Sequence, residues 1–109
     1  AMIIETNELS NNLEISRSPM LIQKEIIGTL HFPKQEVLFS NADIVKREKE
    51  LRRAIVLGNV HNVNVKIDFE DIEGLKKVET TIWGVTDKSI ILKKNVSIPI
   101  HRIVRINIV

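Results

Sequence analysis

Just after the middle of the chain, apolar residues alternate strictly with polar ones, a pattern typical of a half-buried β-strand. The polar run Glu70–Gly74 follows, and its terminal glycine predicts a hairpin turn. Near Val60 the spacing of the apolar residues changes from helical to strictly alternating. A strand from about Val60 to Phe69 is therefore the clearest element. Its apolar face carries Val63, Val65, Ile67 and Phe69, and its polar face carries Asn64, Lys66 and Asp68.

Four more apolar runs, separated by short polar turns, predict four further strands. Pro99 interrupts the ladder because proline has no N–H to donate. Val104, Ile106 and Ile108 are expected on one face of the last strand. Five short strands lying flat would expose their edges, so we expect them to curl into a small antiparallel barrel. The four further strands are Lys77–Val85, Ser89–Leu92, Val96–Ile98 and Ile103–Ile108.

A helix from Asn41 to about Leu57 is predicted to lead into the barrel. Ser40 is placed to cap its N-terminus, and Gly58 to take the left-handed conformation at its C-terminus. An apolar stripe at helical spacing predicts one packed face, with the charged residues facing solvent. The stripe comprises Ile44, Leu51, Ile55 and Gly58, with Ala54 beside it. The fold class is therefore α+β, with residues 41–109 as helix plus barrel.

Residues 1–40 form an N-terminal arm that is expected to pack on the barrel. Ser18-Pro19 resembles a cap followed by proline at the first helical position, which favours a helix through Ile27. The alternation from Ile22 to Leu30 favours a strand or hairpin instead. Both alternatives stay open at this point.

Composition narrows the class of protein. The 109 residues include no cysteine, which excludes disulfides, cysteine zinc sites and thiol nucleophiles. No apolar run reaches the roughly 18–20 residues of a membrane span, and Met2–Asn12 lacks the pattern of a signal peptide, so a cytoplasmic location is expected. Residues 1–43 carry three basic and six acidic side chains, and residues 44–109 carry thirteen and eight. The C-terminal part is therefore basic and the arm acidic.

The run Ser97–Ile106, with a strand reaching Pro99 and an apolar closing strand, resembles the end of SH3-like and Sm-like small barrels. Gly84–Leu92 is similar to the middle hairpin of these modules. The order of helix, glycine, strand, hairpin and proline corner is also similar to two groups of small bacterial proteins. These are the Rof proteins, which bind the transcription terminator Rho, and the YolD-like proteins. The resemblance covers about Val45 to Val109 and implies a small barrel of bacterial origin.

Three residues are candidates for binding a protein partner. His101 and Arg102 follow Pro99 in the predicted corner turn, a loop that small barrels use for contacts. Trp83 lies in a predicted strand. Core packing is the favoured interpretation of Trp83, and an exposed contact residue is the alternative.

Basic side chains on the helix and near the C-terminus suggest a surface for nucleic acid, because Lys and Arg supply the sequence-independent part of such binding. The simpler interpretation is a solvated helix face on which Glu48 pairs with Arg52. The candidate set comprises Arg47, Arg52, Arg53, Lys93, Lys94 and Arg105.

No combination of residues specifies a reaction. The acidic residues around the predicted hairpin, Glu70, Asp71, Glu73 and Glu79, have no companion nucleophile. His31, His61 and His101 lie too far apart for a metal-binding motif. We therefore expect no catalytic site, metal, cofactor or small-molecule substrate. The leading hypothesis is a non-enzymatic module that binds a protein partner or itself, and the alternative is an RNA- or DNA-binding regulator.

Overall fold

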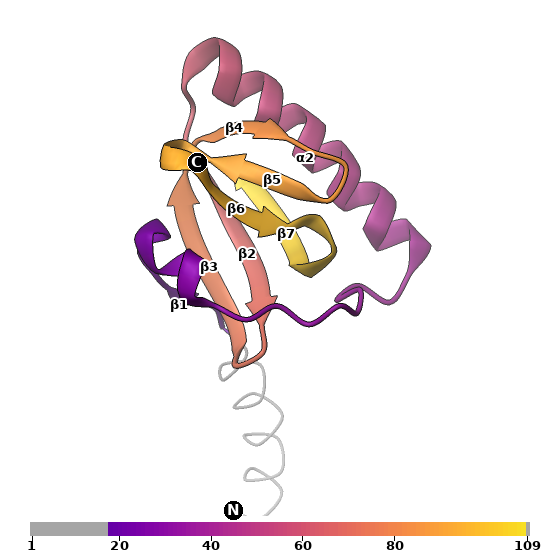
Figure 1. Ribbon diagram of the computed structural model, residues 1–109. Helices are drawn as coiled ribbons and strands as arrows, with labels where there is room; N and C mark the ends of the chain where they lie inside the picture. The colour runs from indigo at the N-terminus through magenta and orange to yellow at the C-terminus, as the bar shows by residue number, and fades with distance from the viewer. Residues whose placement is uncertain (1–17, 109) are drawn as a thin grey trace, which may run out of the picture.

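The computed structural model describes residues 18–108, which form one long α-helix, seven strands and three short 3₁₀ helices. Figure 1 shows the long helix lying diagonally beside the strands. The N-terminal elements are β1 (Met20–Leu21), η1 (Lys24–Thr29) and α2 (Asn41–His61). They are followed by β2 (Val65–Asp71), β3 (Gly74–Thr80), β4 (Ile82–Val85), β5 (Ser89–Leu92), η2 (Lys93–Asn95), β6 (Val96–Pro99), η3 (Ile100–Arg102) and β7 (Ile103–Ile108).

The strands form two sheets, ordered β1-β3-β2-β7 and β4-β5-β6. The α+β class is confirmed, but the five-stranded closed barrel is wrong. The single strand expected over residues 77–85 divides at Thr81, so that β3 belongs to the first sheet and β4 to the second. The arm adds β1, which pairs in parallel with β3. No ladder within residues 18–108 joins the two sheets.

Helix α2 takes the place of strand pairing where a barrel would close. It contacts edge strands of both sheets, β7 of the first and β4 of the second. The Arg47 guanidinium donates to the Ile103 carbonyl over 3.0 Å, and the Ile106 amide donates to the Glu50 carboxylate over 3.3 Å. These helix side chains satisfy backbone groups that a neighbouring strand would otherwise pair. The gap between the sheets is therefore filled by a helix, which explains why the barrel is not closed.

The predicted start of α2 is confirmed, and its predicted end is wrong. The Ser40 hydroxyl accepts from the Asp43 amide over 3.1 Å, as an N-cap should. The helix continues through Gly58 to His61, and Asn62 takes the left-handed conformation with φ of 52°. Gly58 is needed instead for close packing against the backbone of β4. Within residues 18–108, no helix is both long and apolar enough to cross a membrane.

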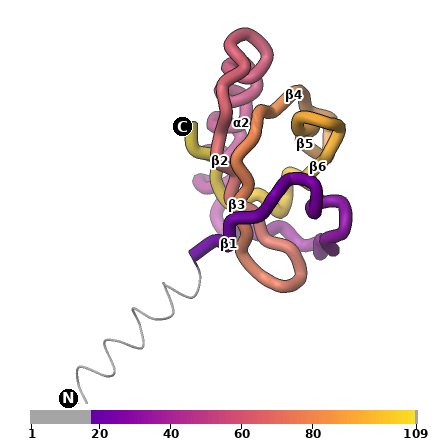
Figure 2. The backbone as a smooth tube through the Cα atoms, turned by 90° about the vertical axis from the view of Figure 1, so that its left-hand side faces the viewer, coloured from indigo at the N-terminus to yellow at the C-terminus, as the bar shows by residue number. Residues whose placement is uncertain are grey.

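The described part of the arm packs on the sheets, whereas residues 1–17 of the predicted arm lie outside the described residues. Neither a regular helix nor a hairpin forms: β1 is two residues long and η1 is a six-residue 3₁₀ helix. Ile27 of η1 is 1% exposed and belongs to the core. Figure 2 shows this segment passing in front of β3, from which it leads toward α2.

The core confirms the alternation predicted for β2 from Val65 onward. The predicted start of this strand at Val60 is wrong, because α2 continues to His61 and β2 begins at Val65. Val65, Ile67 and Phe69 are fully buried. The alternation predicted for β7 is confirmed for Ile106 and Ile108, which pair with Ile67 and Val65, but it is wrong for Val104, because a bulge shifts the register between Asp68 and Phe69. Ile103 pairs with Phe69 and is buried together with Ile106, whereas Ile108 is 38% exposed.

Candidate functional site

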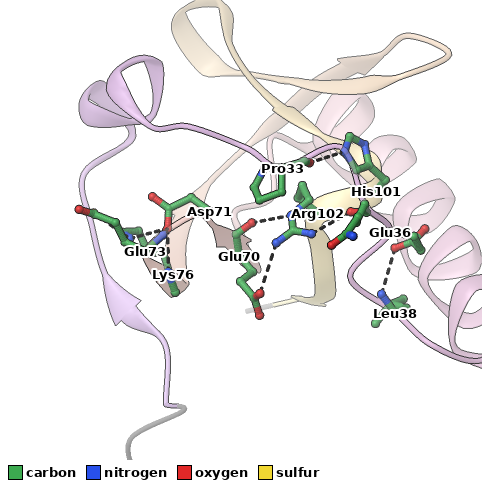
Figure 3. Close-up of polar contacts among 11 residues, drawn as sticks. Pro33, Glu36, Leu38, Glu70, Asp71, Glu73, Lys76, His101 and Arg102 are labelled. Carbon is green, nitrogen blue, oxygen red and sulfur yellow. Dashed lines mark hydrogen bonds and ion pairs between the residues drawn. The ribbon is translucent and has the colours of Figure 1, made fainter.

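The corner turn after Pro99 does not face solvent, because its side chains contact other segments of the protein. Arg102 is 5% exposed. Its guanidinium donates to the Glu70 carbonyl at 2.9 Å and to the Gln35 carbonyl at 2.8 Å, and it pairs with the Glu70 carboxylate at 3.3 Å (Figure 3). The expectation that Arg102 stands where it can reach a partner is therefore wrong. Its donors are used inside the protein.

Residues 31–38, which we call the strap, cover this corner. The His101 imidazole donates to the Pro33 carbonyl over 2.9 Å, and the His101 carbonyl accepts from the Val37 amide over 2.9 Å (Figure 3). At the other end of the strap, the Ile72 amide donates to the His31 carbonyl over 2.8 Å. His101 is therefore half-buried and anchors the strap.

Arg47 joins the strap to α2. Its guanidinium is 5% exposed and forms two hydrogen bonds with the Glu36 carboxylate, at 2.6 and 2.7 Å. Burial raises the pKa of Glu36, but the hydrogen bonds from Arg47 and from the Leu38 amide outweigh it, so the pKa lies below its ordinary value. The prediction that Arg47 faces solvent is wrong, because its partners lie on the strap and on β7.

A groove lined mostly by apolar side chains lies between α2 and the end of β4. Its volume is about 340 Å³. Three of its aliphatic residues, Ile44, Leu51 and Ile55, come from the stripe that was predicted to pack in the core. Aliphatic lining comes from Ile44, Leu51, Ile55, Val85 and Ile100, and charged lining from Arg47, Glu48, Arg52 and Asp87.

β4 forms the second wall of this groove and is an edge strand. Within the described chain it pairs only with β5. Trp83 is 46% exposed and Val85 is 45% exposed. The favoured core interpretation of Trp83 is therefore wrong, and its alternative as an exposed residue fits. An edge strand with exposed apolar side chains and no proline or charge is unusual for a strand that must stay unpaired.

The remaining basic candidates do not form one surface. Arg52 and Arg53 lie on α2, Lys93 and Lys94 on η2, and Arg105 on β7. Arg52 pairs with Glu48, as predicted, and Arg105 lies 3.7 Å from the Asp68 carboxylate. Among residues 18–108, Arg53, Lys93 and Lys94 are exposed and form no ion pair.

The acidic residues of the β2–β3 hairpin have structural partners. Asp71 is 2% exposed, and its carboxylate accepts from the Lys76 ammonium over 2.8 Å and from the Glu73 and Gly74 amides. Burial raises its pKa, but these hydrogen bonds prevail and hold the pKa below its ordinary value. The described residues contain no group of three or more side chains suited to hold a metal ion.

Asp68 on β2 is the one buried side chain of residues 18–108 with an oxygen that lacks a hydrogen-bond partner. Its carboxylate lies between Lys77 and Arg105, at 3.8 and 3.7 Å. Burial raises its pKa, and the two cations offset this only in part. Because its carboxylate already lies near two cations, does not line the groove and belongs to no metal-binding group among the described residues, we assign it no chemistry.

We predict that Asp68→Asn changes how stability depends on pH. The raised pKa means that the ionised carboxylate is less favourable in the folded protein than in the unfolded chain. This penalty is absent below the unfolded pKa and fully present above the folded pKa. The wild type should therefore lose stability relative to Asp68→Asn as pH rises through this window. Urea denaturation of both proteins between about pH 3 and 8 measures the difference, and parallel curves would contradict the prediction.

Sequence reasoning missed the groove because its walls come from elements far apart in the chain. The signal that could have indicated the groove is the apolar stripe of α2, because some of its residues line the groove and are not fully buried in the core. Comparison with known proteins adds nothing to this geometry: no protein-family model matches the chain, and neither the curated proteins nor the solved structures contain a match.

Proposed function

We propose that this protein is a non-enzymatic interaction module that binds an extended segment of a protein partner in the groove between α2 and β4. The observation that carries the proposal is the combination of an aliphatic groove and an unpaired strand edge at the same place. A strand edge supplies backbone hydrogen bonds, and an adjacent apolar groove supplies side-chain contacts. Trp83, exposed on the same strand, adds a residue type that is enriched among strong contact residues.

Apart from Asp87, the charged residues that line the groove are paired within the protein. Arg52 is paired with Glu48, and Arg47 with Glu36. The summed charge of the lining is thus close to zero. Its aliphatic side chains can pack against the apolar side chains of a ligand. A second copy of the chain is one source of the segment, which would make the protein a homo-oligomer.

Val85→Arg tests the proposal. Val85 is half-exposed, so the fold tolerates the change, but the new side chain would place a charge in the groove. We expect at least a tenfold loss of association. The measurement is the solution mass over a range of concentrations together with the yield of a photo-crosslinked partner.

Val60→Arg is the matched control, because Val60 is 66% exposed at the end of α2 and does not line the groove. Association should be lost in Val85→Arg and kept in Val60→Arg. A wild-type protein that stays monomeric and crosslinks to nothing would contradict the proposal. Equal behaviour of the two variants would also contradict it.

Nucleic-acid binding is the weaker proposal. Of its six candidate residues, Arg47 is buried, and Arg52 and Arg105 are within ion-pair distance of carboxylates. Retention of mixed RNA at low salt, lost as salt rises and lost in Arg53→Glu with Lys93→Glu and Lys94→Glu, would favour it over the groove. The relation to SH3-like and Sm-like barrels, and to the Rof and YolD-like groups, is likewise a proposal that rests on the residue pattern of the Pro99 corner.

A further inference from the structure

The two ladders of the β4-β5-β6 sheet determine which backbone groups of β4 are free. The Thr86 amide donates to the Ser89 carbonyl over 2.7 Å, so Thr86 bonds toward β5. In an antiparallel ladder the bonded pairs alternate, so the next residue, Val85, directs its N–H and C=O away from β5. The hydrogen bonds of β5 lead to the same conclusion. The Lys88 carbonyl accepts from the Ile100 amide over 2.9 Å, so Lys88 and, two residues on, Ile90 bond toward β6. Ile90, the residue opposite Val85, therefore does not bond toward β4.

The free edge of β4 is covered at one end and open at the other. At the Ile82 end, α2 lies so close that a Cβ added to Gly58 would be 2.3 Å from the Ile82 carbonyl oxygen. At the Val85 end, the helix and the strand are separated by the groove, which Val85 lines. The unpaired N–H and C=O of Val85 therefore lie at the end of the edge where the groove opens.

Building on the proposed function, we infer that the groove takes its ligand as an added β-strand: an extended peptide with aliphatic residues at alternate positions, followed by a lysine or arginine. Alternate side chains of a strand point to one side, where Leu51, Ile55 and Ile100 form an aliphatic wall. The peptide backbone exchanges hydrogen bonds with Val85.

The cation follows from charge complementarity. Asp87 lines the groove two residues beyond Val85, and within residues 18–108 it forms no ion pair or side-chain hydrogen bond. Asp87 lies in the turn that directly follows β4. In a ligand that runs parallel to β4, a basic residue one or two positions past the aliphatic pair therefore comes near the Asp87 carboxylate.

The test uses the full chain and a fluorescein-labelled synthetic peptide, Ser-Thr-Ile-Thr-Ile-Thr-Lys-Ser. We expect binding in fluorescence polarisation, weakened about fivefold when the lysine is replaced by glutamate, as for an exposed ion pair. Asp87→Lys should reverse this preference. Saturation with the peptide should slow hydrogen exchange of the Val85 amide at least tenfold, as measured by NMR.

Three outcomes would overturn the inference. Exchange at Val85 that is unchanged by bound peptide excludes strand addition. Equal affinity of the lysine and glutamate peptides excludes the role of Asp87. If neither peptide binds, although Val85→Arg still loses its partner and Val60→Arg does not, the ligand class is wrong and the proposed function stands.

Discussion

Replacing Arg102 by methionine is expected to lower the free energy of unfolding by about 2 kcal/mol, because two partly buried carbonyls lose their donor and each unsatisfied group costs at least about 1 kcal/mol. Methionine keeps the apolar stem but supplies no N–H. The Glu70 carbonyl of β2 and the Gln35 carbonyl of the strap would then lose their donor. Chemical denaturation measures the loss, and the strap should become the first segment to exchange its amides.

Arg53→Met is the control for this variant. Arg53 is exposed on α2 and its side chain forms no ion pair within residues 18–108, so its replacement should change stability by no more than about 0.5 kcal/mol. If Arg102→Met proved as stable as Arg53→Met, the buried contacts of Arg102 would not be what holds the strap.

Gly58→Ala is expected to destabilise the protein by about 2 kcal/mol, although alanine is the better helix former by about 1 kcal/mol. The added Cβ would lie 2.3 Å from the Ile82 carbonyl oxygen, which belongs to the backbone and has no rotamer to change. Helix and strand must separate, and overpacking of this kind costs about 1–3 kcal/mol or more. Thermal and urea denaturation both report the change.

Gly28→Ala is the matched control, since nothing lies within 4 Å of a Cβ added at Gly28. This change should be neutral or stabilise the protein by up to about 1 kcal/mol, because it restricts the unfolded chain. A stabilised Gly58→Ala would show that close packing between α2 and β4 is not required.

Features that depend on a few neighbouring residues could be predicted from the sequence. The alternation of β2, the hairpin turn after Asp71 and the Ser40 cap each follow from residues within one turn or one strand. Gly58 shows the limit of such reasoning, because a glycine near a helix end serves either a left-handed cap or a close contact. Asn62 provides the cap, which the local pattern did not distinguish.

Features that depend on distant partners could not be predicted. The carboxylate that neutralises Arg47 is 11 residues away, and the carbonyl that pairs with Arg102 is 67 residues away on the strap. An arginine with no partner nearby in the sequence is expected to be exposed. Arg47 and Arg102 were therefore both predicted to lie on the surface, although both are buried. The same holds for the groove, whose walls belong to α2 and β4. The residues that line it were predictable as apolar, but their exposure was not.

Because α2 fills the gap between the two sheets, it affects when the chain can fold during translation. The bonds from α2 to β7 join residues 56 positions apart, so the helix is made long before the strand that its side chains hold. Until the last strand leaves the ribosome, Arg47 lacks one acceptor and the aliphatic stripe of α2 has little to cover it. This unit therefore completes its folding only after β7 has been made, and until then the nascent chain presents a helix with an uncovered aliphatic stripe that a chaperone is suited to hold.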